Sequence, residues 1–160
     1  MIIHNIYGEC VCCFVVCSTC VFLTMSWFFS GIPYTVEVVT GDKSNAATSA
    51  NVYVILYGGK DGNQTSGKIW LQGGSFKRAR TDVFNVEVAE MLGRLSRIDI
   101  GHDNAGAGPG WFLDQVMIDC SAAGVEQVFR CGKWLALDED DGAIERTLYE
   151  YSHKQKKKSQ

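Results

Sequence analysis

The stretch YTVEVVT, residues 34–40, carries an apolar side chain at every second position. Tyr34, Val36 and Val38 therefore fall on one face of an extended chain, and the polar side chains fall on the other face. This period of two is typical of a strand that packs one face on a core and exposes the other to water.

The same kind of pattern recurs along most of the chain. We expect further strands at residues 50–57, 82–88, 95–102, 111–119, 126–137 and 144–151, with a short eighth strand at 69–71. Only residues 88–95 read as a helical turn. Turns rich in Gly, Asn, Asp and Ser separate these runs, and strands this closely spaced predict an all-β fold, an antiparallel β-sandwich.

Length and charge limit the domain organisation. A chain of 160 residues favours one domain with short extensions, and a net charge of −3 gives no reason to expect nucleic acid as a partner. The charge is uneven, because four lysines lie among the last seven residues. We divide the chain into a Cys-rich apolar leader (1–31), the β domain (32–151) and a basic tail (152–160), which is typical of a solvated, disordered end.

The leader has no charged residue between Glu9 and Glu37 and holds five of the seven cysteines. Residues 11–29 are just long enough to cross a bilayer as a helix, yet no Lys or Arg precedes Lys43. Three interpretations stay open: a signal segment or anchor, a tight zinc site, or a leader with no folded role. A signal segment would make the protein secreted or membrane-anchored.

Several blocks in order resemble one known family. They are YTVEVVTGD, TDVFNVEV, IDIGHDNAGAGPGWFLDQVMI, FRCGKWLAL and EDDGAIERTL, between Tyr34 and Tyr149. Together they resemble the PLAT domain, also called the lipoxygenase homology domain. The resemblance implies an eight-stranded sandwich of two four-stranded sheets. It also implies a non-catalytic module that binds a protein partner or an anionic membrane surface, with calcium assisting in several members.

GHDN, GWFLD and KWLA are most similar to the tandem PLAT repeats found in hair-cell stereocilia. This likeness implies a module at the cytoplasmic face of the membrane, linking membrane to cytoskeleton in the stereocilium and serving hearing. Two rival interpretations stay open. In the first, the chain is a structural repeat unit without calcium or lipid binding. In the second, it is an accessory domain of a lipid-acting enzyme.

The sequence offers no catalytic inventory. Its three histidines are His4, His102 and His153, and it contains no nucleophile elbow, phosphate loop or His-Glu-x-x-His motif. A lipoxygenase holds its iron in a large helical domain that has no counterpart here, so we expect no iron, no small-molecule substrate and no enzyme. We interpret His102 as a loop histidine whose ring is satisfied by local hydrogen bonds.

Calcium is the sharper hypothesis for the loops. The family resemblance implies ligands at the Gly41 backbone oxygen, Asp42, Asn51, Asp103 and Asn104. The related repeats often carry Asp where this chain has Ser49, so one charged ligand is missing and we expect weak binding. The alternative is that these Asp and Asn residues only form turns.

Aromatic and basic residues between 68 and 80 predict an interfacial patch made of Trp70, Leu71, Phe76, Lys77 and Arg78. The alternative is that Trp70 and Phe76 face the core beside a solvated basic edge.

Trp111, Asp114 and Trp134 are interpreted as structural. Because Asp114 shares strand parity with Phe112 and Val116, we expect it to be half-buried and hydrogen-bonded. The acidic run 138–142 reads as a hairpin turn. Cys120 and Cys131 either pair in an oxidising compartment or stay reduced.

Overall fold

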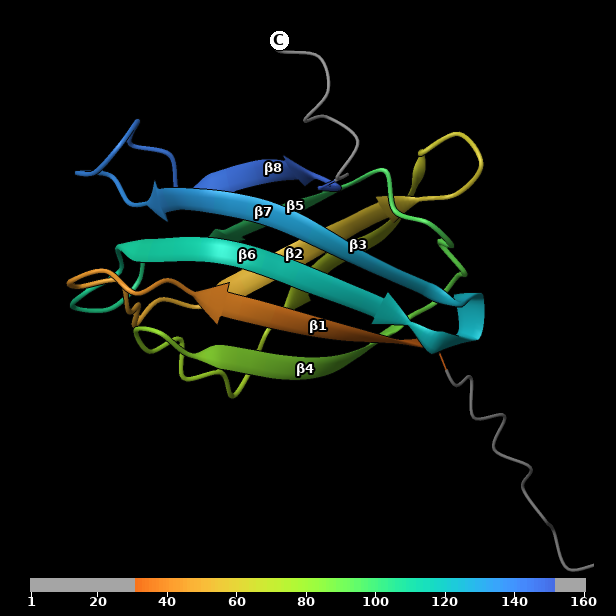
Figure 1. Ribbon diagram of the computed structural model, residues 1–160, viewed down its shortest axis with the longest axis horizontal. Helices are drawn as coiled ribbons and strands as arrows, with labels where there is room; N and C mark the ends of the chain where they lie inside the picture. The colour runs from red at the N-terminus through yellow and green to blue at the C-terminus, as the bar shows by residue number, and fades with distance from the viewer. Residues whose placement is uncertain (1–30, 152–160) are drawn as a thin grey trace, which may run out of the picture.

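The computed structural model describes residues 31–151, which form two packed β-sheets (Figure 1). The strands are β1 (Ile32–Thr40), β2 (Val52–Gly58), β3 (Gln64–Trp70), β4 (Thr81–Val88), β5 (Arg97–His102), β6 (Trp111–Cys120), β7 (Val125–Leu135) and β8 (Glu145–Tyr149). Sheet A has the order β4-β1-β6-β7 and sheet B the order β3-β2-β5-β8, with every neighbouring pair antiparallel. The predicted eight-stranded sandwich is confirmed. The predictions for residues 1–30 and 152–160 lie outside the described residues.

Alternating side chains of both sheets build one core. Tyr34, Val36 and Val38 of β1 are at most 1% exposed, as their spacing predicts. In the facing sheet, Val54 of β2 lies opposite Ile100 of β5, and both are fully buried. They belong to the same core cluster as the three β1 side chains. Apolar burial of this extent is the main stabilising term of the fold.

Residues 89–96 are an irregular loop, so the expected helical turn is wrong there. Tertiary hydrogen bonds take the place of helical ones. The Tyr34 hydroxyl accepts the Leu92 N–H at 3.1 Å, and the buried Gln127 amide bonds both the N–H and the carbonyl of Leu95 at 2.7 and 2.9 Å. The described helical segment is a short 3₁₀ turn at Ser121–Ala123.

Two further expectations are settled by the topology. Residues 136–144 cross from sheet A to sheet B, so they are not the hairpin turn expected of the acidic run. Cys120 and Cys131 are both free, because Cys120 pairs with Val125 and Cys131 lies six residues further along β7, about 20 Å away. Residues 31–151 contain no helix long and apolar enough to span a membrane.

Candidate binding site at one end of the sandwich

Four loops meet at one end of the sandwich, on the left in Figure 1: residues 41–51, 71–80, 103–110 and 136–144. Antiparallel order places them together, because odd-numbered strands end and even-numbered strands begin there. Backbone hydrogen bonds join them directly. Ser49 N–H donates to the Gly108 carbonyl at 3.0 Å, and Ala79 N–H donates to the Gly41 carbonyl at 3.2 Å. We call this set of loops the loop end.

Asp103 is the central polar contact of the loop end. Its Oδ1 accepts the N–H groups of Asn51 and Ala105, both at 3.0 Å, and its Oδ2 accepts the Asn51 side-chain amide at 2.6 Å. These hydrogen bonds, led by the Asn51 side chain, lower the pKa of the Asp103 carboxyl below its ordinary value. The carboxylate therefore clamps the loop after β5 to the start of β2.

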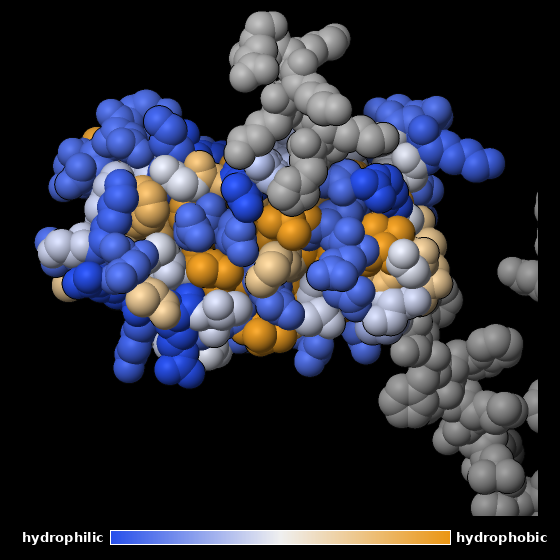
Figure 2. Space-filling view, in the orientation of Figure 1, coloured by the Kyte–Doolittle hydropathy of each residue, from blue (hydrophilic) through white to orange (hydrophobic). Residues whose placement is uncertain are grey.

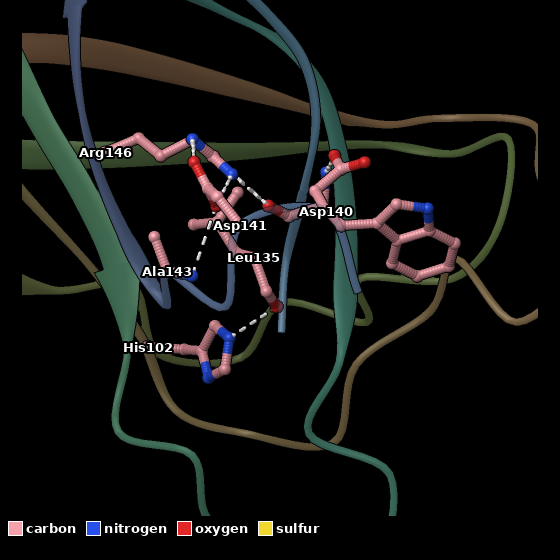
Figure 3. A network of polar contacts seen from close by, with 7 residues as sticks. His102, Leu135, Asp140, Asp141, Ala143 and Arg146 are labelled. Atoms are coloured by element: carbon pink, nitrogen blue, oxygen red, sulfur yellow. Dashed lines mark hydrogen bonds and ion pairs between the residues drawn. The ribbon is translucent and has the colours of Figure 1, made fainter. Parts of the chain in front are cut away.

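His102 is buried beside this clamp. Its Nδ1 accepts the Asn104 N–H at 3.1 Å, so Nε2 carries the hydrogen and donates to the Leu135 carbonyl at 2.9 Å. Figure 3 shows the ring aimed at Leu135. Both ring nitrogens are used, which agrees with the expected satisfied histidine and leaves no nitrogen for a substrate.

The structure brings together some of the predicted calcium ligands. Asn51, Asp103 and Asn104 adjoin one another, whereas Asp42 is paired with Arg78 at 2.6 Å and the Gly41 carbonyl accepts Ala79 N–H. Within residues 31–151 no group of three or more His, Cys, Asp or Glu side chains is close enough to hold a metal ion.

The predicted oxygen donors nevertheless suit a hard cation, because carboxylate, amide and backbone oxygens are its ligands. Asp42 and Asp103 are both exposed to solvent at the same end of the sandwich. Asn104 adopts φ 58°, the left-handed conformation that asparagine tolerates in turns. This conformation is also expected if the Asp and Asn residues of these loops only form turns.

The predicted interfacial patch is wrong for Leu71 and Phe76. Both are buried, at 4% and 5% exposure, and the Phe76 ring packs on Phe84 and Trp111 with centroids 5.7 and 5.6 Å away. The Asp82 carboxylate accepts the backbone N–H groups of Ser75 and Phe76 at 2.9 Å, which folds the loop inward.

The rest of the predicted patch is accessible. Trp70 is 44% exposed, and Lys77 and Arg78 are exposed on the adjoining loop. The Trp70 ring meets the Tyr53 ring edge-on at 5.2 Å, and Lys68 Nζ lies 5.6 Å from its centroid. The contact residues reduce to one aromatic side chain with neighbouring cations.

A groove of about 700 Å³ opens between the loops beside Trp70. Its polar lining includes Ser49, Asn51, Gln72 and Asp103, and its walls are residues 48–52 and 70–76. The groove is therefore lined by two of the predicted metal ligands, Asn51 and Asp103, and by one accessible contact residue, Trp70. Its volume falls within the range of ligand pockets.

Of the three predicted structural residues, Trp111 and Trp134 pack as expected. Trp111 is fully buried, and its Nε1–H donates to Thr40 Oγ1 at 3.0 Å. Trp134 is half-buried and meets the Phe112 ring edge-on at 5.4 Å.

Asp114 is exposed, so its predicted half-burial is wrong. A β-bulge explains the difference. Leu113 pairs with Thr40 and Lys133, Gln115 pairs with Val39 and Arg130, and Asp114 between them has no partner on either neighbouring strand. The extra residue shifts the alternation, so Leu113 and Val116 both point into the core.

Arg146, which was not predicted as a site residue, braces the crossover loop (Figure 3). Its guanidinium donates to both carboxylate oxygens of Asp141, at 2.5 and 3.0 Å, and to the Trp134 carbonyl at 2.8 and 3.1 Å. This pairing lowers the pKa of Asp141 to about 2. The Asp140 carboxylate accepts the Trp134 N–H at 2.8 Å. The alternating strand pattern carried no signal for this contact.

Comparison with known proteins decides the family. The PLAT/LH2 domain matches residues 34–149, almost all of the sandwich. The chain belongs to the PLAT family. The human Lipoxygenase homology domain-containing protein 1 is 46% identical over 129 residues, which cover 81% of this chain and 6% of that protein. Human Polycystin-1-like protein 3 is 32% identical over 122 residues, which cover 76% of the chain and 7% of the relative.

Solved structures agree with the fold. The structure of coral 8R-lipoxygenase, for which calcium activation through a C2-like domain is described, superposes with a TM-score of 0.62 at 24% identity. The match covers 74% of this PLAT chain and 17% of the lipoxygenase. This chain therefore spans only a small part of the length of the relatives it matches. What it shares with them is the PLAT domain.

Proposed function

We propose that this PLAT domain is a non-catalytic adaptor whose loop end contacts an anionic membrane surface or a protein partner, assisted by calcium. One observation carries the proposal: exposed Trp70 and Asp103 line one groove, and Asp42, Lys77 and Arg78 are exposed on loops at the same end of the sandwich. The 46% identity to Lipoxygenase homology domain-containing protein 1 supports a role of the same type. In this proposal the protein lies at the cytoplasmic face of a membrane and links that membrane to the cytoskeleton in stereocilia.

Membrane contact is supported by the chemistry of the loop tips. An indole at the lipid interface places its apolar body among acyl chains and its polar edge in water, and nearby cations attract anionic headgroups. Trp70 is exposed at the end of β3, and Lys77 and Arg78 are exposed on the loop that follows it. Leu137, 64% exposed, adds an apolar side chain from the crossover loop.

Calcium would be held by Gly41, Asp42, Asn51, Asp103 and Asn104. Only two of these residues are carboxylates, so the affinity is low. The Asp42–Arg78 pair, exposed by 69% and 55%, contributes little to stability and exchanges readily. A cation on Asp42 would release Arg78, which then becomes available to a lipid phosphate or an acidic partner.

The groove favours a protein partner as the second candidate. Its polar lining beside a half-exposed Trp70 suits a peptide anchored by one apolar side chain, whereas a flat bilayer would leave a groove empty.

Vesicle co-sedimentation of the full chain tests the membrane contact. Phosphatidylserine vesicles and neutral phosphatidylcholine vesicles are compared, in calcium and in chelator. The Trp70→Ala variant should lose binding to the anionic vesicles, and the matched control Tyr149→Ala, exposed on sheet B, should keep it. Equal binding of both variants would reject the loop end as the contact. Absence of any calcium-dependent binding would favour the protein partner or a purely structural repeat.

A further inference from the structure

Two loops that connect the sheets at the loop end carry opposite charge. Residues 71–80 run from β3 to β4 and contain Lys77, Arg78 and Arg80 with no carboxylate. The crossover loop, residues 136–144, runs from β7 to β8 and contains four carboxylates with no Lys or Arg. β3 and β4 are edge strands on one side of the sandwich, and β7 and β8 are the edge strands on the other side. The loop end therefore has a basic edge and an acidic edge.

Figure 2 shows mainly polar side chains over the loop end, on the left, and apolar side chains along the middle of sheet A. At the acidic edge, Asp140 and Asp141 are engaged in the backbone and arginine contacts described above (Figure 3). Asp138 and Glu139 are exposed, and within residues 31–151 neither of them forms an ion pair. The charge of these two carboxylates is thus available to a partner.

A second groove, of about 690 Å³, lies beside the two carboxylates, and both of them line it. Its walls are mainly alanine, glycine and proline, and half-buried Trp134 and 64% exposed Leu137 add larger apolar surfaces. None of its lining residues belongs to the groove beside Trp70. The second groove is therefore an apolar channel with an acidic rim, and its volume falls within the range of ligand pockets.

A cationic segment with apolar side chains fits this groove best. The carboxylates of Asp138 and Glu139 attract Lys or Arg, whose hydrocarbon stems pack on apolar walls. Lys43, on an adjoining loop, lies over the Phe112 ring at 4.0 Å and pairs with neither carboxylate. An acidic segment would instead meet like charge at the rim.

We propose that this second groove binds a basic, apolar peptide segment of a protein partner. The inference rests on the proposed adaptor function, and it gives the protein partner a chemistry and a place of its own. The loop end then holds an anionic surface at its basic edge and a cationic segment at its acidic edge.

Fluorescence anisotropy of labelled peptides with the full chain tests the proposal, in chelator so that calcium contributes nothing. The probe is a peptide of alternating lysine and leucine, and its control alternates glutamate and leucine. We expect the lysine peptide to bind the wild type and the glutamate peptide to fail. The double variant Asp138→Asn/Glu139→Gln should bind the lysine peptide about fivefold more weakly, because two surface charge pairs are lost.

A second variant tests the groove apart from its charge. Ala107 is an exposed residue of the lining, so Ala107→Phe fills the groove without entering the core. The matched control is Ala122→Phe, because Ala122 is exposed on the 3₁₀ turn at the opposite end of the sandwich. Ala107→Phe should lose the lysine peptide, and Ala122→Phe should keep it.

The proposal is overturned if the wild type does not bind the lysine peptide, or if the double variant or Ala107→Phe binds it as tightly as the wild type. Loss of the peptide in Trp70→Ala would also overturn it, by placing the peptide in the other groove. The membrane contact fails separately. The double variant should keep its binding to anionic vesicles, because loss of negative charge does not weaken attraction to an anionic surface. Absence of vesicle binding with intact peptide binding would reject the membrane contact alone.

Discussion

Arg78 Nε lies 2.6 Å from Asp42 Oδ1, which joins the loop before β4 to the loop after β1. The Arg78 guanidinium is thus ion-paired with the Asp42 carboxylate, which is one of the proposed calcium ligands. In the proposed site arginine and calcium would compete for this oxygen, because the same negative charge attracts both.

This competition gives an unusual prediction. The Arg78→Gln substitution should tighten calcium binding by up to about fivefold, because a surface ion pair contributes at most about 1 kcal/mol. Asp42→Asn should weaken binding, since it removes a charged ligand. Calorimetric titration of the full chain measures both. Equal weakening by both substitutions would show that Arg78 does not compete.

The buried bond between Trp111 and Thr40 should be costly to break. In Thr40→Val the indole N–H loses its acceptor inside the core, and we expect the free energy of unfolding to fall by about 1–3 kcal/mol. Urea denaturation measures the change. The control Thr35→Val, on the outer face of the same strand, should change stability by no more than about 0.5 kcal/mol. Similar losses in the two variants would contradict the special role of the indole bond.

The bulge in β6 makes a prediction about two consecutive residues. Leu113→Ala should cost about 2–5 kcal/mol, because Leu113 is fully buried. Asp114→Ala should stay within about 0.5 kcal/mol, because the side chain is exposed. Thermal or urea unfolding of the two variants decides this. A large loss for Asp114→Ala would restore the half-buried interpretation.

These contacts show where sequence patterns suffice and where they do not. The alternation around Val36 predicts β1 because its burial depends on parity along a single strand. The same alternation mispredicts the burial of Asp114, because one inserted residue changes the parity. The burial of Phe76 was also mispredicted, because Asp82, six residues away, turns its loop inward. The proposed oxygen ligands of the loop end came from the family resemblance and not from any strand pattern. The Arg78 and Arg146 pairings depend on loop closure, which no local period encodes.

Asp141 predicts a pH dependence of stability. Its pKa falls from the ordinary 3.8 to about 2 in the folded protein, chiefly through the Arg146 hydrogen bonds. A lowered folded pKa stabilises the protein above pH 3.8, and this contribution is lost as the pH falls from about 4 through 2. Asp141→Asn should therefore flatten the acid limb of unfolding free energy against pH. An unchanged limb in that variant would contradict the assignment.

The central claim, that the loop end is the contact surface, is tested most directly by mapping hydrogen exchange of the full chain with and without phosphatidylserine vesicles in calcium. The account predicts new protection in residues 41–51, 71–80, 103–110 and 136–144, and unchanged exchange in the loop 89–96 at the opposite end of the sandwich. Protection confined to residues 89–96 or to the outer sheet faces would contradict it.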